Sequence, residues 1–252
     1  MRLDRLLVQR GLASSRTQSQ KMISAGQVKA KLGGQWTLQN KASSKLDDHI
    51  ELDVTQGDEQ KYVSRAGLKL EGALKRIGLD INGCVALDVG QSTGGFTDCL
   101  LKKGASHIVG VDVGRDQLVD RLRSNDRVTC IEKTNARELS VKTFEEACGF
   151  SQFDIIVMDV SFISQSLILP QLPVLLKPSG TLVSLVKPQF EVGSAGIAKG
   201  GIVRDVALYA EVEKRLCEQV GALGLRVDSF FDSPIAGGDG NREFFLCATK
   251  PL

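Results

Sequence analysis

The chain has 252 residues, with 32 Lys+Arg against 30 Asp+Glu, a formal net charge of +2 and 42% hydrophobic residues. This composition excludes a disordered or collagen-like chain and suffices for one large core or two modest ones. The longest charge-free stretch, residues 160–176, is too polar for a membrane span, and the charged first eleven residues lack the apolar core of a secretory signal. Six scattered cysteines without a CxxC pair disfavour a zinc site or a disulfide scaffold, so we expect a cytoplasmic protein without a metal.

Charge is distributed unevenly along the chain. Residues 1–45 contain nine Lys/Arg and one acid, so this segment carries +8 and the remainder carries −6. Residues 61–76 form a second basic patch, with five Lys/Arg against Glu71. Two charge regimes indicate two domains. We expect a small basic domain over residues 1–58, a linker over 59–66 and a larger domain over 67–252.

The basic domain begins with two predicted helices. Leu3, Leu6 and Leu7 share one face over residues 2–10, and Gly11 ends this pattern. Ser14 or Ser15 can cap a second helix that runs through residue 23 and ends at Gly26. QVKAKL, at residues 27–32, and HIELDV, at residues 49–54, are predicted strands, and a Gly-Gly turn follows the first of them.

The words RLDRLLVQRGLASSR, MISAGQVKAK and DDHIEL occur in an order that resembles the small RNA-binding fold first seen in a ribosomal small-subunit protein and reused in pseudouridine synthases. The resemblance weakens after Lys31, where LGGQWTLQNKASSK replaces the usual Asn-Gly turn and proline. It implies that the basic face of the helices lies on structured RNA, and a solvated surface is the alternative. The candidate RNA-binding residues of this domain are Arg2, Arg5, Arg16, Lys21 and Lys29.

From Cys84 onward, apolar strands alternate with helical stretches. The predicted strands are CVALDVG, HIVGVDVG, RVTCIE, FDIIVMDV, GTLVSLVKP, LRVDSFF and REFFLCAT. This order predicts a doubly wound, seven-stranded α/β sheet, in which ligands bind at the carboxyl ends of the strands. The residues that end the strands are therefore the first candidates for function.

The first of these strands runs into a glycine-rich turn, LDVGQSTGGFTD. The turn lacks the lysine of a phosphate loop and the GxGxxG spacing of a dinucleotide site. Asp88 at the strand tip and Asp112 at the end of the next strand suit a cofactor with an ammonium group and a ribose diol, which S-adenosylmethionine has. A turn used only for packing is the alternative. The candidate cofactor-binding residues here are Asp88, Gly90, Gln91, Ser92, Gly94, Gly95, Phe96, Asp112 and Val113.

Four charged residues lie where a solvated face is not expected. Lys69 lies on the helix before the first strand of the larger domain, and Asp159, Lys187 and Glu243 lie at strand ends. Taken one at a time, each could form an ordinary buried ion pair; taken together, they indicate a catalytic group.

The words YVSRAGLKLEGAL, LDVGQSTGGFTD, TNAR, MDVSFIS, LVKPQFE, GIVRD and NREFF resemble the TlyA or hemolysin A family, whose second domain is similar to FtsJ-type ribose 2′-O-methyltransferases. The resemblance implies a catalytic tetrad of Lys69, Asp159, Lys187 and Glu243. It also implies methyl transfer from S-adenosylmethionine to the 2′-hydroxyl of a ribosomal RNA nucleotide, with cytidine as the base. Departures from the family pattern, such as Gln91 in place of Ala, leave this tetrad whole.

The chemistry requires a base, because a ribose hydroxyl is a poor nucleophile until its proton is removed. We expect Lys187 to be this base, with Lys69 as a nearby second ammonium and the two acids orienting the lysines. The word after the fourth strand of the sheet, Asp159-Val160-Ser161-Phe162, is not the one that base-nitrogen methyltransferases carry. The cysteines are more simply interpreted as apolar filler than as the nucleophile of a carbon-5 enzyme.

Several further residues are candidates for contacts with the ligands. Asn135 and Arg137 could touch the adenine or close the site, and ion pairing of Arg137 to Glu132 or Glu138 is the alternative. The glycine-rich segment 190–204 is either a mobile cover over RNA or a plain connector. Three further candidate RNA-binding residues are Arg65, Lys199 and Arg204.

Two other functions compete with methyl transfer to ribosomal RNA or ribosomal subunits. A membrane-active protein is suggested by the family name, but the sequence shows no strongly apolar helix face. An RNA-binding protein with an inactive methyltransferase fold is the second alternative, and the complete tetrad argues against it.

Overall fold

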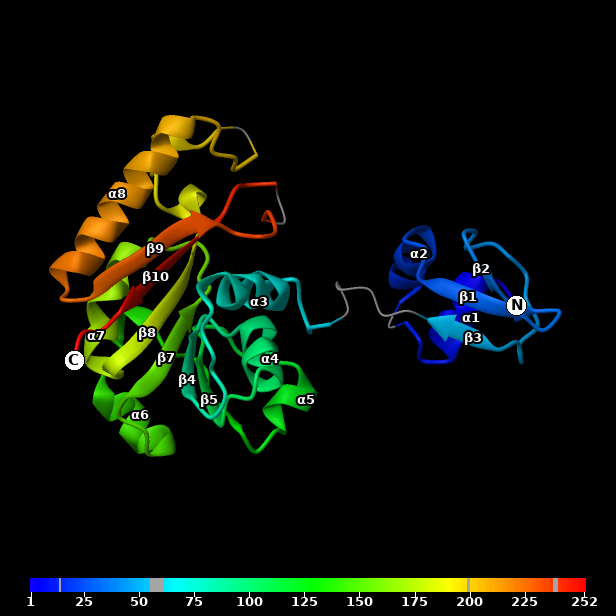
Figure 1. The fold of residues 1–252 in the computed structure, drawn as a ribbon, viewed down its shortest axis with the longest axis horizontal. Coiled ribbons are helices and arrows are strands. Elements are labelled where there is room, and N and C mark those ends of the chain that lie inside the picture. Colours follow the sequence, from blue (N-terminus) through cyan, green and yellow to red (C-terminus); the bar gives the residue numbers. More distant parts are fainter. Residues whose placement is uncertain (14, 55–60, 199, 238–239) are drawn as a thin grey trace. The chain divides into compact units, whose positions relative to one another are not determined.

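The computed structural model describes residues 1–13, 15–54, 61–198, 200–237 and 240–252, and it divides the chain into two compact units, Met1–Lys61 and Tyr62–Leu252 (Figure 1). The expected fold class is confirmed: a small α+β unit precedes a doubly wound α/β unit. Across the part of the chain described, no helix has the length and apolar character needed to cross a membrane.

Unit 1 packs two helices against a three-stranded antiparallel sheet of order β2-β1-β3. Its core joins Leu3 and Leu7 to Met22, Ile23 and Val28. The β2 strand does not appear among the predicted elements; it forms because two consecutive glycines with positive φ reverse the chain after β1. The elements are α1 (Leu3–Gln9), α2 (Arg16–Ser24, capped by Ser15), β1 (Val28–Leu32), β2 (Gln35–Leu38) and β3 (Leu52–Val54).

Asp4 fastens the two helices of unit 1 to each other. Its side chain is fully buried and accepts hydrogen bonds from Arg2 on one side and from Arg16 and Gln20 of α2 on the other. The hydrogen bond from Arg2 is the largest cause that holds the pKa of Asp4 well below its usual range. Two of the nine basic residues in this segment are therefore paired with its one acid.

Unit 2 contains a seven-stranded sheet of order β6-β5-β4-β7-β8-β10-β9, in which β10 alone runs antiparallel to both of its neighbours. All seven predicted strands are present: β4 (Val85–Val89), β5 (His107–Val111), β6 (Val128–Ile131), β7 (Phe153–Met158), β8 (Leu176–Val186), β9 (Arg226–Asp232) and β10 (Phe244–Thr249). The helices are α3 (Ala66–Ile77), α4 (Gly95–Lys102), α5 (Asp120–Arg123), α6 (Val141–Cys148), α7 (Leu172–Leu175) and α8 (Val206–Ala222).

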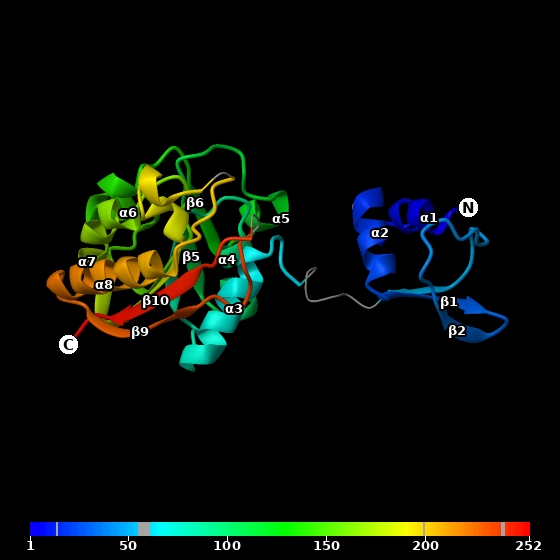
Figure 2. The same cartoon turned by 90° about the horizontal axis from the view of Figure 1, so that it is seen from above.

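Helices cover both faces of this sheet. Alternate residues of the central strands point to opposite sides: Leu87 joins the core under α6, α7 and α8, whereas Ala86 joins the core under α3, α4 and α5. Figure 2 shows α3 and α8 on opposite sides of the sheet. With both faces covered, a ligand can approach only at an edge or at the strand ends.

The boundary between the units differs from the expected linker, 59–66. Residues 55–60 lie outside the described residues, but residues 62–66 belong to unit 2. Tyr62 is buried among the side chains of α3 and α4, and the backbone N–H of Val63 donates to Asp98 at 2.9 Å. These contacts tie the segment to α4, so it is part of the larger unit rather than a free connector.

Candidate active site

The ends of three neighbouring strands bring three of the four predicted catalytic residues together at one end of the sheet. Asp159 directly follows β7, and Lys187 directly follows β8. Because β10 is antiparallel and Phe244 pairs with Val186, Glu243 comes at the next position opposite Lys187. Residues from two carboxyl ends and one amino end thus meet at this edge.

The tetrad is arranged as two ion pairs. Lys69 Nζ lies 2.5 Å from Glu243 Oε2, and both side chains are largely buried. Lys187 Nζ lies 2.5 Å from Asp159 Oδ1, outside hydrogen-bonding angles, and donates a hydrogen bond to Ser161 Oγ at 2.8 Å. Each lysine therefore has its own acid.

The glycine-rich turn lies directly against this edge. A Cβ on Gly90, whose φ is +85°, would meet the Asp159 carbonyl oxygen at 2.4 Å. A Cβ on Gly94 would meet leucine side chains of the α5 region at 2.4 Å and 2.7 Å, and one on Gly95 would meet Ser64 Oγ at 2.2 Å. Glycine is required at Gly90, because its φ is positive and the atom that a Cβ would meet belongs to the backbone.

Asp88 lies beneath the turn and not at its surface. It is fully buried, and one of its oxygens accepts a hydrogen bond from Thr97 at 2.6 Å while the other has no partner in the described protein. Gln91, which packs over Gly110, donates to the same Thr97 hydroxyl at 2.9 Å. Burial raises the pKa of Asp88 to about 7. Neither cavity at the site is lined by Asp88, so it supports the turn from below.

A cleft of about 930 Å³ opens beside the turn and is large enough for a cofactor. Asp112 lines this cleft, and its two oxygens accept backbone N–H groups from Ser92 at 2.7 Å and Gly114 at 2.6 Å, leaving further lone pairs for a ligand. Val113 is 77% exposed and supplies an apolar wall. A smaller cavity of about 140 Å³ shares residues with this cleft and is lined by Lys187.

Asn135 and Arg137 also line the large cleft. Arg137 donates to Asn135 Oδ1 at 3.2 Å, while Glu132, one of its two possible ion partners, pairs with Arg123 instead. Phe96 lines the smaller cavity, but it is only 2% exposed and its ring stacks on Phe245 in the core.

Sequence reasoning did not assign roles to Thr97, Ser161 and Phe162. Thr97 lies within the glycine-rich word and is the hydrogen-bond partner of Asp88. Phe162 is 91% exposed, has a φ of +65° and lies 5.2 Å from the ring of Phe190. A non-glycine residue with this backbone conformation three positions after a strand-end acid is a feature that the sequence does not reveal.

The predicted RNA-binding residues fall into two groups. Arg5, Lys21 and Lys29 are exposed on unit 1, whereas Arg2 and Arg16 are held by Asp4. In unit 2, Arg65 and Arg204 are exposed, and Lys199 lies outside the described residues.

Comparisons with known proteins agree with this geometry. Residues 62–250 match the FtsJ-like methyltransferase family model, and residues 1–29 match that of the S4 domain. A Mycobacterium tuberculosis protein named 16S/23S rRNA (cytidine-2′-O)-methyltransferase TlyA is 40% identical over 97% of this chain and 88% of its own length. A Bacillus subtilis protein with the provisional name of an rRNA methyltransferase, YqxC, is 44% identical over 97% of this chain and 84% of its own length. A solved Streptococcus thermophilus structure that bears a provisional hemolysin name is 39% identical, covers 100% of this chain and 88% of its own, and has a TM-score of 0.73.

Proposed function

Because the chain belongs to the FtsJ-like methyltransferase family, we propose that it transfers a methyl group from S-adenosylmethionine to the 2′-hydroxyl of a ribosomal RNA nucleotide, and that the base is cytidine. The observation that carries the proposal is the Lys187–Asp159 pair in a small cavity that joins the large cleft. At this position a lysine can accept the proton of a hydroxyl that faces a cofactor, and a carboxylate can orient that lysine.

The residues of the large cleft fit S-adenosylmethionine. The partly exposed carboxylate of Asp112 suits a ribose diol, and Val113 suits the face of an adenine. The turn at Gly90 leaves no room for a side chain, so the backbone itself borders the cavity. Asp88 acts from beneath by orienting Thr97 and Gln91, and not by direct contact with the amino-acid end of the cofactor.

When bound, S-adenosylmethionine supplies a methyl group on a positively charged sulfur, which is already activated for transfer. In its neutral form, Lys187 would take the proton of the 2′-hydroxyl as that oxygen accepts the methyl group. Asp159 orients Lys187 and stabilises the resulting ammonium. Lys69 and Glu243 form the adjoining pair, whose role we propose is to hold the nucleotide hydroxyl in line.

RNA contacts are proposed on both units. The S4 domain match and the exposed residues Arg5, Lys21 and Lys29 support RNA binding by unit 1. In unit 2, Phe162 offers an exposed aromatic face to an unstacked base at the rim of the cleft.

The test is methyl transfer from radiolabelled S-adenosylmethionine to isolated ribosomal subunits, with the modified nucleotide mapped by its resistance to alkaline hydrolysis. Lys187→Ala is expected to abolish transfer while the cofactor Kd stays within about twofold, because Lys187 does not line the large cleft proposed to hold the cofactor. Lys177→Ala is a matched control, since Lys177 lies on β8, the strand that Lys187 follows, and also pairs with an aspartate, Asp154, at 2.9 Å. An equal loss of cofactor affinity in Lys187→Ala would contradict the assigned role.

The same assay separates the alternatives. A wild-type protein that binds RNA without labelling it would be an inactive methyltransferase fold. Membrane activity is not favoured, because the family model and the named relatives indicate methyl transfer. Leakage from liposomes in a detergent-free assay would restore it.

A further inference from the structure

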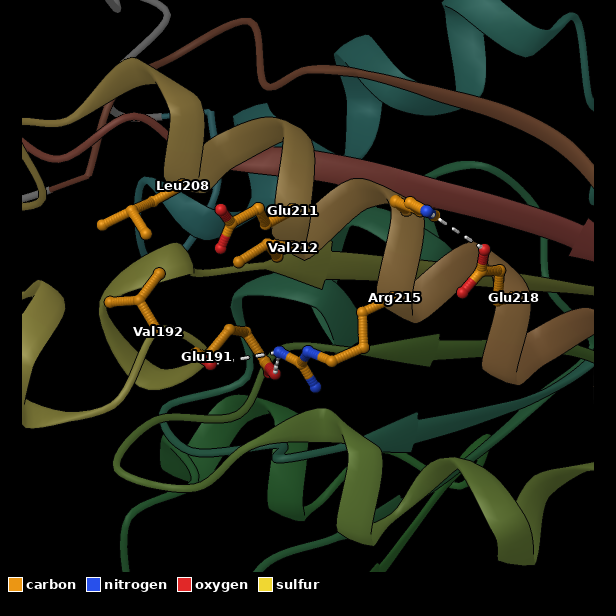
Figure 3. Close-up of a pocket in the computed structure, with 8 residues that line it drawn as sticks. Glu191, Val192, Leu208, Glu211, Val212, Arg215 and Glu218 are labelled. Atoms are coloured by element: carbon orange, nitrogen blue, oxygen red, sulfur yellow. Dashed lines mark hydrogen bonds and ion pairs between the residues drawn. The ribbon is translucent and has the colours of Figure 1, made fainter.

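A buried carboxylate outside the tetrad lies just beyond Lys187. Glu191 ends the short 3₁₀ turn Pro188–Phe190, and its backbone N–H donates to the Pro188 carbonyl at 2.9 Å. Its side chain is 1% exposed. Figure 3 shows it pointing to the groove beneath α8, with Arg215 reaching it. Burying a carboxylate in this way costs free energy unless hydrogen bonds or an ion pair compensate for the lost hydration.

The Glu191 carboxylate holds the segment that follows β7. Oε1 accepts the backbone N–H of Gln165 at 2.7 Å, and Oε2 accepts the hydroxyl of Ser164 at 2.7 Å. These residues come five and six positions after Asp159. The side chain of Gln165 then continues to β8, donating to the Leu185 carbonyl at 2.5 Å and accepting from Ser184 at 2.7 Å.

Helix α8 holds the other side of this hydrogen-bond network around Glu191. Arg215 donates both to Glu191 Oε2 at 2.9 Å and to the Glu191 carbonyl at 3.1 Å (Figure 3). One turn later, Gln219 donates to the Ser166 carbonyl at 2.8 Å. Two residues on one face of a long helix thus clamp the loop that carries Ser164 and the turn that carries Glu191.

Resting on the proposed function, we propose that Glu191 is a positioning residue for methyl transfer, which fixes the loop after β7 to the turn after β8 and so sets how Asp159 meets Lys187. The two reacting side chains lie on different strands, and the 2.5 Å between them depends on the relative placement of these two loops. A rate that depends on alignment is sensitive to displacements of about 1 Å, which can cost ~10²-fold.

The charge of Glu191 matters as well as its shape. Its two oxygens face only donors, namely a backbone N–H, a hydroxyl and a guanidinium. Glutamine has nearly the same size, but its amide nitrogen would face one of these donors. At least one hydrogen bond to the side chain of residue 191 would therefore be lost.

The test compares Glu191→Gln with Glu218→Gln in single-turnover methyl transfer to ribosomal subunits. Glu218 lines the same groove but is 67% exposed and faces only Lys214, at 4.0 Å, so it is the matched control. We expect Glu191→Gln to lower the transfer rate by about 10- to 100-fold. The cofactor Kd and the RNA Kd should stay within about twofold, and the pH profile of the rate should shift, because the Lys187–Asp159 pair is disturbed. Glu218→Gln should match wild type in every measurement.

A second readout does not depend on activity. Hydrogen–deuterium exchange of residues 159–167 and 187–192 should rise in Glu191→Gln and stay unchanged in Glu218→Gln. If wild type transfers no methyl group, the proposed function fails. The exchange pattern still tests whether Glu191 fixes the two loops to each other. A wild-type rate in Glu191→Gln, or a loss of cofactor affinity equal to the loss of rate, overturns the inference.

Arg215→Gln covers the case in which Glu191→Gln does not fold. Arg215 is 44% exposed, so its loss leaves the core intact and removes only the hydrogen bonds from α8 to Glu191. We expect the same pattern at a smaller size, about 3- to 10-fold in rate. A wild-type rate and a wild-type pH profile in a folded Arg215→Gln protein overturn the inference.

Discussion

The fully buried side chain of Asp88 makes the stability of unit 2 depend on pH in a direction opposite to that of most acids. Burial raises its pKa to about 7 in the folded protein, against the ordinary value of 3.8. Between these two values the folded state binds the extra proton, so the contribution of Asp88 to stability is most favourable near pH 4 and falls as the pH rises towards 7. Above about pH 8 the loss is complete, and the difference between the two pKa values corresponds to about 4 kcal/mol.

Asp88→Asn removes this titration while keeping a side chain of similar size that can still accept from Thr97. The free energy of unfolding of the variant minus that of wild type is therefore expected to rise by up to about 4 kcal/mol between pH 4 and pH 8. Urea titrations followed by far-UV circular dichroism measure it. The fluorescence of the one tryptophan, Trp36, does not, because Trp36 lies in unit 1.

Asp154→Asn is the control of opposite sign. Burial acts to raise the pKa of Asp154, but hydrogen bonds from Lys177 and the backbone N–H of Val85 outweigh it, and the pKa is lowered. Asp154 therefore stabilises the fold above its unfolded pKa, and this contribution is lost as the pH falls. A difference between Asp88→Asn and wild type that is the same at pH 4 and pH 8 would refute the reasoning for Asp88.

Three further changes test other parts of the structure. Gly90→Ala should cost about 1–2 kcal/mol of stability and lower cofactor affinity, measured by thermal unfolding and calorimetry, whereas Gly83→Ala, at a similar φ with open space around it, should retain affinity. Asp112→Asn should raise the cofactor Kd by about 10-fold, because a charged acceptor facing the cleft is lost; an unchanged Kd contradicts its assignment. Asp4→Asn should destabilise unit 1 by roughly 1–3 kcal/mol, read from Trp36 fluorescence, and an unaltered midpoint would show that the clasp adds nothing.

The larger fold followed from the sequence because most strands of unit 2 contain a short apolar run bounded by polar residues. The β2 strand did not, since QWTL is exposed at every position and gives no burial pattern. Its partner across the glycine turn, and not its own composition, makes it a strand.

The placement of the candidate catalytic residues could be predicted from the sequence, but their pairing could not. The strand-end positions of Asp159, Lys187 and Glu243 indicated one edge of a sheet, and this placement is what the structure has. Which lysine meets which acid depends on the antiparallel register of β10, which no local pattern encodes. Asp88 was expected to help bind the cofactor because a strand-tip acid in a glycine-rich word is typical of a ligand contact. Its burial arises from the way Thr97 and Gln91 close over it.

The ion pairs of Asp4 with Arg2 and Arg16 affect how steeply the affinity of unit 1 for a polyanion falls with salt concentration. Each cation that neutralises a phosphate releases a counterion, so the steepness of the salt dependence counts the cations that are free to do so. Arg2 and Arg16 already share a carboxylate, and moving either onto RNA would leave a fully buried acid with one partner fewer. The slope for unit 1 should therefore count exposed residues such as Arg5, Lys21 and Lys29, and fall short of the nine cations in the first 45 residues.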